Sequence, residues 1–217
     1  MYAIRPNGSL KWTLTISDAL TGVSIGSDGT LYIAGSNGGL YSVSSAGALK
    51  WSRQTGGSFY SGCPAIASDG TIYLAGANGF VYAFDSTGTN IWTYAARPGD
   101  SFKGSVTISP NGTILAASVS GAVYAINPDG TNQWISFNSG EFYFGAPGIA
   151  PDGTIYVADN SSGKIFAINP DGSAKWEYHS GSAFYGSVSV GSDGTAYALS
   201  YSGIAFAVGT DGSLQWS

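Results

Sequence analysis

Charged residues are scarce in this chain: 8 Lys and Arg and 13 Asp and Glu make up 10% of 217 residues, against roughly 25% in an ordinary globular domain. The net charge of −5 gives no basic patch that would neutralise phosphates, which excludes nucleic acid as a partner. A single cysteine, Cys63, excludes an intrachain disulfide, and a single histidine, His179, excludes zinc sites rich in His or Cys. No apolar run approaches the ~18 residues that span a bilayer, so we expect no membrane insertion.

The first residues also lack the basic and apolar regions of a signal peptide. Cytoplasmic and extracytoplasmic locations both stay open at this point. Hydrophobic residues make up 43% of the chain and aromatic residues 14%, which is enough for a sizeable core and excludes disorder. Glycine is abundant, with 33 residues, and its positions carry the argument that follows.

Two independent markers repeat along the chain with a period of about 41 residues. Turns of the type Asp-Gly-Thr or Asn-Gly-Thr recur every 41 or 42 residues, and tryptophans are spaced by 39, 41, 42, 42 and 40 residues. Agreement between the two markers indicates a true structural repeat. The tryptophans are Trp12, Trp51, Trp92, Trp134, Trp176 and Trp216.

Within one period, residues 63–96, four short runs of β-branched and aromatic residues are separated by Asp-Gly, Asn-Gly and Ser-Thr-Gly turns. This pattern predicts a four-stranded antiparallel meander. A repeat of ~40–45 residues with four strands is typical of a propeller blade. We therefore predict an all-β protein, a single β-propeller domain over residues 1–217 with almost no helix. Its parts are a half-blade at 1–16 and complete blades at 22–54, 63–96, 104–138, 145–179 and 186–217.

The first strand of each predicted blade combines small residues with one aliphatic position, which runs from Ile25 through Ile66 to Val190. We expect this aliphatic position to belong to the core between blades, and the small residues to fit a crowded inner strand. Cys63 precedes such a strand and is interpreted as a small buried residue.

The third and fourth strands share a pattern of Ala, Asp or Asn, Gly and Trp at fixed offsets, as in Ala83-x-Asp85-x-x-Gly88-x-x-x-Trp92. It recurs from Ala125 to Trp134 and from Ala167 to Trp176, and degrades in the first, second and last copies. The pattern resembles the tryptophan-docking repeat of the PQQ-like (quinoprotein dehydrogenase-like) β-propellers. The resemblance implies that each tryptophan packs against the next blade, with a structural role.

The same resemblance argues against the chemistry of the quinoprotein dehydrogenases. Those enzymes hold the quinone beside Ca²⁺ and a disulfide between adjacent cysteines, within eight blades. This chain has one cysteine and fewer blades, and no matching Ca²⁺ ligand set is recognisable. We expect neither PQQ nor a metal, and the chain is more similar to the non-enzymatic members of the family, which points to an extracytoplasmic location.

The predicted N-terminal half-blade supplies only a third and a fourth strand. Three alternatives follow: a two-stranded sixth position, a fragment of a larger propeller protein or enzyme, or a second chain that supplies the missing strands. Because an unpaired strand edge favours association, a homo-oligomer through the incomplete blade is one expectation.

The connections between successive blades break the repeat and carry most of the candidate binding residues. We expect them to open on one face of the disc, where aromatic and charged side chains would form a shallow surface for a protein or carbohydrate ligand. The alternative is that one aromatic ring of each loop fills the space between blades; Phe59, Phe102, Tyr143 and Phe184 fit that role best. The candidate binding residues are Tyr60, Arg97, Asp100, Lys103, Glu141, Phe144 and Tyr185.

Catalytic patterns are weaker. His179 lies at a strand end without a nucleophile motif, and nothing local brings Glu141 and Asp100 together as a carboxylate pair. The leading hypothesis is a non-catalytic binding scaffold. Its alternatives are a lectin-like glycan-binding module and an enzyme with one site near the axis.

Overall fold

The computed structural model describes residues 1–142 and 145–217, and in these residues every regular element is a β-strand. The strands form five four-stranded sheets and one two-stranded sheet, each an antiparallel meander in chain order. The all-β propeller architecture predicted from the repeat is confirmed. The first two sheets comprise β1 (Tyr2–Ile4) and β2 (Leu10–Thr13), then β3 (Leu20–Ile25), β4 (Leu31–Gly35), β5 (Gly39–Val43) and β6 (Leu49–Gln54).

The remaining four sheets repeat the arrangement of the second. Their strands are β7 (Ala65–Ile66), β8 (Ile72–Ala75), β9 (Phe80–Phe84) and β10 (Asn90–Ala95); β11 (Thr107–Ile108), β12 (Ile114–Ala117), β13 (Ala122–Ile126) and β14 (Asn132–Phe137); β15 (Gly148–Ile149), β16 (Ile155–Ala158), β17 (Lys164–Ile168) and β18 (Ala174–His179); and β19 (Ser189–Val190), β20 (Ala196–Leu199), β21 (Ala205–Val208) and β22 (Leu214–Trp216).

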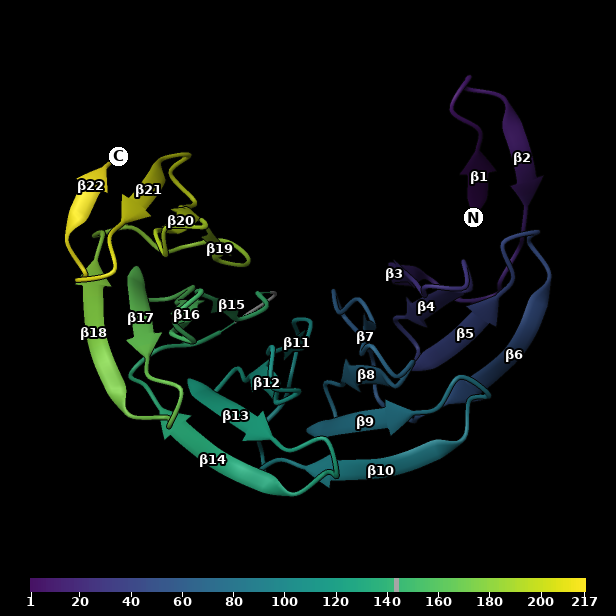
Figure 1. Cartoon of the computed structure of the whole chain (residues 1–217), viewed down its shortest axis with the longest axis horizontal. Coiled ribbons are helices and arrows are strands. Elements are labelled where there is room, and N and C mark those ends of the chain that lie inside the picture. The colour runs from purple at the N-terminus through teal and green to yellow at the C-terminus, as the bar shows by residue number, and fades with distance from the viewer. Residues whose placement is uncertain (143–144) are drawn as a thin grey trace.

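The sheets stand side by side in an open arc (Figure 1). The first strand of each four-stranded sheet lies toward the centre of the arc and the fourth strand forms its outer wall, while β1 and β2 lie at the other end of the arc from β22. The half-blade is therefore the two-stranded sheet of β1 and β2. Pairing of a second copy with this hairpin stays a prediction, which light scattering of the purified chain tests.

The inner strands approach each other closely because a glycine precedes β7, β11, β15 and β19, and Gly22 lies within β3. A Cβ atom on Gly104 would lie 2.2 Å from the carbonyl oxygen of Gly145, and one on Gly145 would lie 2.6 Å from that of Gly186. Side-chain hydroxyls then link neighbouring inner strands: Thr107 donates to the carbonyl of Pro147 at 2.7 Å. The small residues expected on the inner strands are thus explained by backbone contact between sheets.

Two expectations for the inner strands are wrong. Cys63 is exposed rather than buried: it precedes β7, its Sγ lies beside Gly22 of the neighbouring sheet, and the next residue, Pro64, is the buried one. Ile25 is 68% exposed, although the matching residues Ile66 and Val190 are partly buried. Ile25 lies on the sheet next to the two-stranded hairpin, which has no inner strands to cover it.

The core lies between adjacent sheets rather than within one sheet. One cluster joins Tyr73 and Val81 of the β7–β10 sheet to Ile114 and Ile126 of the β11–β14 sheet, and similar clusters lie at the next two junctions. Burial of both faces of the middle sheets, and of one face of each terminal four-stranded sheet, accounts for the scarcity of charge, since a buried charge is costly without a partner.

Each of the first five tryptophans contacts the next sheet in the same way. The indole N–H of Trp92 donates to the carbonyl of Pro128 at 2.9 Å, and a Cβ atom on Gly130 would lie 2.7 Å from the indole ring. The corresponding N–H bonds of Trp12, Trp51, Trp134 and Trp176 reach Ser45, Ser86, Pro170 and Thr210. Trp216, on β22, is 52% exposed.

Candidate functional site

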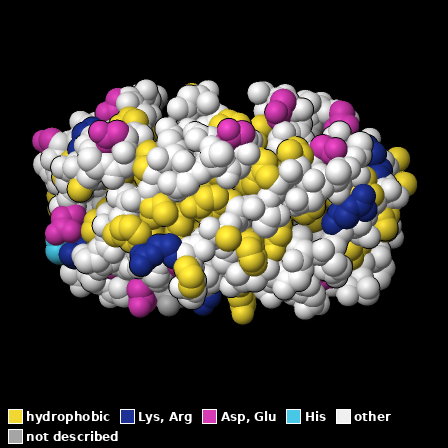
Figure 2. Space-filling model, turned by 90° about the horizontal axis from the view of Figure 1, so that it is seen from below, with side chains coloured by type: hydrophobic (Ala, Val, Ile, Leu, Met, Phe, Trp, Pro, Cys, Tyr) yellow, Lys and Arg dark blue, Asp and Glu magenta, His cyan; other side chains and the backbone are white. Residues whose placement is uncertain are grey.

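The meander places two kinds of connection on opposite faces of the arc. The long loops between sheets and the turns between second and third strands share one face, which we call the loop face. The turns between first and second strands and between third and fourth strands share the other, the turn face. The turn face carries eight aspartates, and Figure 2 shows acidic side chains gathered mainly along one rim. These are Asp28, Asp69, Asp85, Asp129, Asp152, Asp171, Asp193 and Asp211.

The turn-face aspartates are occupied by local hydrogen bonds. Asp152 accepts a hydrogen bond from the backbone N–H of Thr154 at 2.9 Å and lies 3.1 Å from the ammonium of Lys175. These bonds, from Thr154 first, lower the pKa of Asp152 to about 2. The aspartates therefore fix turn geometry, and among the described residues no group of three or more His, Cys, Asp or Glu is placed to hold a metal.

On the loop face, one aromatic ring in each of the four loops that follow β6, β10, β14 and β18 fills the space between sheets. Phe59, Phe102 and Phe184 are at most 1% exposed, which confirms their interpretation as packing residues. In the loop between β14 and β15 the buried ring is Phe142, 2% exposed. Sequence reasoning had given this role to Tyr143, which lies outside the described residues, as does the candidate binding residue Phe144.

The residues next to these buried rings remain accessible. Tyr60 is 54% exposed, and the ammonium of Lys103, from the next loop, lies 5.6 Å from the centre of its ring. Tyr185 is 58% exposed and packs edge-on against Tyr201 at 5.2 Å. Phenol rings of this kind offer an apolar face with a polar edge.

A third exposed group on the loop face combines a cation with an aromatic ring. Arg97, in the loop between β10 and β11, places its guanidinium 4.7 Å from the ring of Phe137 at the end of β14. Phe137 is 58% exposed. Four of the candidate residues therefore lie on one face: Tyr60, Arg97, Lys103 and Tyr185. They belong to three separate pairs, Tyr60 with Lys103, Arg97 with Phe137, and Tyr185 with Tyr201.

Asp100 differs from this group because its carboxylate points inward. It is 9% exposed and accepts a hydrogen bond from the hydroxyl of Tyr124 at 2.7 Å. Burial and the bond to Asp100 raise the pKa of Tyr124 to about 12. Asp100 thus holds a loop against the β11–β14 sheet, and its charge is not offered on the loop face as the sequence suggested.

Glu141 is exposed, and its backbone N–H donates to the carboxylate of Asp159 at 2.7 Å. Asp159 is fully buried and also accepts hydrogen bonds from the backbone and hydroxyl groups of Ser161 and Ser162. Burial raises the pKa of Asp159, but these hydrogen bonds outweigh it and leave the pKa below its ordinary value. Sequence reasoning missed Asp159. The signal in the sequence was the turn between β16 and β17, residues 159–163, which is one residue longer than the matching turns of the other sheets.

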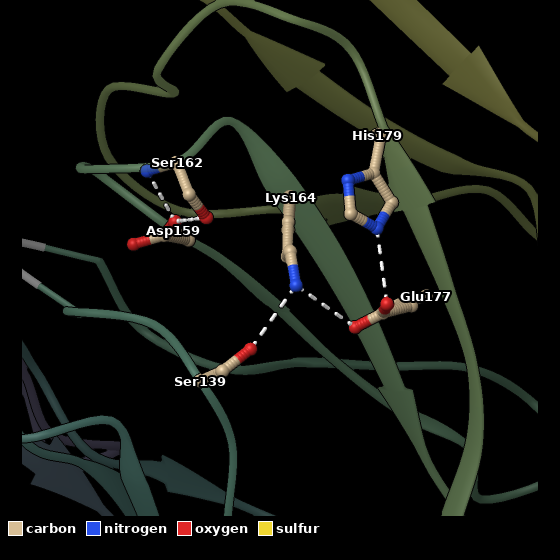
Figure 3. A network of polar contacts seen from close by, with 6 residues as sticks. All are labelled: Ser139, Asp159, Ser162, Lys164, Glu177 and His179. Atoms are coloured by element: carbon tan, nitrogen blue, oxygen red, sulfur yellow. Dashed lines mark hydrogen bonds and ion pairs between the residues drawn. The ribbon is translucent and has the colours of Figure 1, made fainter.

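His179 is the last residue of the outer strand β18, the position that Phe137 occupies on β14. Glu177 accepts from His179 at 3.0 Å and from Lys164 at 3.3 Å, and Lys164 also reaches Ser139 at 3.1 Å (Figure 3). The hydrogen bond from His179, then that from Lys164, lowers the pKa of Glu177. His179 bonds to Glu177, whereas Asp100 bonds to Tyr124.

Among the described residues, no helix has the length and apolar character to cross a membrane. A family model described as "Outer membrane protein assembly factor BamB", of the PQQ-like repeat type, matches residues 2–136 and 60–217. These two ranges together cover nearly the whole chain. A search of curated protein sequences gives no significant match.

Solved structures share the fold. BamB from Moraxella catarrhalis superposes with a TM-score of 0.79 at 20% identity, covering 96% of this chain and 67% of that one. Virginiamycin B lyase from Staphylococcus aureus, in a catalytically inactive form with quinupristin, gives 0.78 at 16% identity, covering 93% and 71%. The chain thus spans about two-thirds of either structure, and its fold is common to a lyase and an assembly factor.

Proposed function

Because the chain belongs to the family of PQQ-like β-propellers described by BamB, we propose that it is a non-catalytic scaffold that binds a protein ligand through its loop face. The supporting observation is the row of accessible aromatic and cationic side chains there: Tyr60 with Lys103, Arg97 with Phe137, and Tyr185 with Tyr201. Tyr and Arg are enriched where proteins bind one another.

The distribution of charge supports the loop face over the turn face. On the turn face, aspartates such as Asp152 bind their own turns, so a ligand there would compete with existing hydrogen bonds. On the loop face, the cation–aromatic contacts Tyr60–Lys103 and Arg97–Phe137 are worth only about 0.5–1 kcal/mol each at exposed sites. A ligand can therefore replace them at small cost.

An extracytoplasmic location is part of this proposal. The matching family is described by an outer membrane assembly factor, and the absence of cysteine pairs is compatible with an oxidising compartment. The absence of catalysis is also part of it, and quinone-dependent oxidation of an alcohol by the purified chain would overturn that part.

The test compares three immobilised forms of the chain as baits for extracts of the source cell envelope. They are the native chain, a loop-face variant with Tyr60→Ala, Lys103→Ala and Tyr185→Ala, and a turn-face control with Asp85→Asn and Asp129→Asn. We expect at least one protein to be retained by the native chain and the control and lost from the loop-face variant. Identical retention by all three baits contradicts the proposal.

A second candidate is a lectin-like role, and one observation favours it. Tyr60 and Tyr185 follow equivalent buried phenylalanines, and both expose more than half of their surface, which gives similar platforms on different sheets. Sugars stack on such rings. Glycan-array binding that is lost in Tyr60→Ala and Tyr185→Ala supports this role, and an array without signal removes it.

A further inference from the structure

One junction between sheets departs from the repeat at a position that otherwise carries a tyrosine. The second residue of the second strand is Tyr32, Tyr73, Tyr156 and Tyr197 in four sheets, but Leu115 in the β11–β14 sheet. Each of these tyrosines packs against the tryptophan of its own sheet, with ring centres 5.5 to 6.0 Å apart. Trp134 is the tryptophan whose sheet supplies leucine instead.

A groove of about 340 Å³ lies at this position, between the β11–β14 and β15–β18 sheets. Its walls include Leu115, Trp134, Ile155 and the proline rings of Pro110 and Pro170. The volume is within the range of small-molecule sites, which are concave and mostly apolar. The groove reaches the core because leucine lacks the ring that would fill the space beside the indole.

The corresponding groove between the β3–β6 and β7–β10 sheets shows the effect of the tyrosine. That groove, of about 540 Å³, is lined by Tyr32, and neither Trp51 nor Ile72 contributes to its wall, so the two grooves differ in which residues they reach and not in a gain of volume beside leucine. The residues matching these two, Trp134 and Ile155, do line the groove beside Leu115. A tyrosine therefore closes the way to the indole, and a leucine leaves it open.

The neighbouring junction provides an internal template for an occupant. The ring of Tyr156 lies 5.5 Å from that of Trp176, and its hydroxyl donates to the carbonyl of Gly194 in the next sheet at 3.2 Å. One repeat earlier, the glycine that corresponds to Gly194 is Gly153, and it lines the groove beside Trp134. The groove thus has the aromatic partner and the acceptor position that a phenol ring uses elsewhere in this chain.

We propose that this groove binds a small neutral phenol, whose ring takes the place of the missing tyrosine beside Trp134 and whose hydroxyl donates to the carbonyl of Gly153. A cavity left by a truncated side chain binds molecules of the shape that was removed. The groove lies on the turn-face side, so this proposal does not depend on the proposed function of the loop face.

Isothermal titration calorimetry with p-cresol, the tyrosine side chain as a free molecule, tests the proposal. We expect one saturable site on the native chain, with a dissociation constant on the order of 1 mM for a ligand of this size. Toluene, which lacks the hydroxyl, should bind roughly three- to tenfold more weakly, since one hydrogen bond is lost. No saturable binding of p-cresol by the native chain overturns the proposal.

Variants locate the site. Leu115→Tyr and Leu115→Phe supply the missing ring from the chain itself and should abolish binding, whereas the volume-conserving control Leu115→Met should keep it within about threefold. Tyr156→Leu should open a matching groove beside Trp176 and raise the stoichiometry to two. Folding is checked by circular dichroism. Undiminished binding in folded Leu115→Tyr or Leu115→Phe contradicts the site, and a single site in folded Tyr156→Leu contradicts the template.

Discussion

The contact between each tryptophan and the next sheet makes a quantitative prediction for Gly130. Its backbone has a φ of +85°, and a Cβ atom would lie 2.7 Å from the indole of Trp92. Gly130→Ala therefore adds two costs: a strained backbone and a displaced indole. Gly70 is the matched control, because its φ is +87° and nothing lies within 4 Å of the position that an added Cβ atom would take.

The backbone cost is about 1–2 kcal/mol for alanine in this left-handed conformation and is common to both variants. Gly130→Ala also loses the hydrogen bond from the indole to Pro128, worth about 1 kcal/mol, and disturbs packing of the indole with Tyr73, worth about 1 kcal/mol more. The free energy of unfolding should thus fall by about 2 kcal/mol more in Gly130→Ala than in Gly70→Ala.

For a chain of this length, that difference lowers Tm by about 4–8 °C, measured by differential scanning calorimetry at one scan rate. Trp92→Phe keeps an aromatic ring, removes the N–H donor and adds no backbone strain, so loss of the hydrogen bond should lower its free energy of unfolding by about 1 kcal/mol. If Gly130→Ala and Gly70→Ala lower Tm equally, to within about 1 °C, the indole contact does not stabilise the junction and the assigned structural role of the tryptophans is refuted.

Three further predictions concern titration and exposure. The folded pKa of Asp152, about 2, lies below its ordinary value of 3.8, so its stabilising contribution is present above pH ~4 and is lost as the pH falls toward 2. Over that range, the Tm of Asp152→Asn should therefore change less than the Tm of the native chain. Parallel curves of Tm against pH contradict this prediction. Asp100→Asn should lower the pKa of Tyr124 from about 12 while leaving it above 10, because Tyr124 stays buried. An ultraviolet titration of the phenolate measures this shift. An unchanged pKa excludes the hydrogen bond from Tyr124 to Asp100. Exposed Cys63 should react fully with Ellman's reagent without denaturant, which a buried thiol would not.

The repeat made most of the fold predictable from sequence. Glycine in the tight turns and tryptophan in the fourth strand mark every period independently, so the strands between them could be placed without the structure. The loops were harder. Phe142 is buried, but the loop lengths vary and nothing in a single sequence singles it out among three consecutive aromatic residues.

The direction of side chains next to the axis was also beyond sequence reasoning. Cys63 and Pro64 are neighbours of similar size, and only the assembled sheets make Pro64 buried and Cys63 exposed. For Asp100, the deciding partner is Tyr124, 24 residues away. Its hydroxyl makes burial of the carboxylate possible, and the two residues come together only when loop and sheet are in place.

Comparison of equivalent positions in the five sheets shows which residues packing explains and which depart from the repeat. At the second residue of the second strand, Tyr156 fills its junction and donates to Gly194, so packing alone explains tyrosine there. Leu115 is as well buried, at 1% exposed, yet gives up the ring contact with Trp134, and the indole then lines a groove of about 340 Å³. Loss of a ring from a core junction ordinarily costs stability. A groove kept open at that cost is better explained by an occupant that restores the contact than by packing.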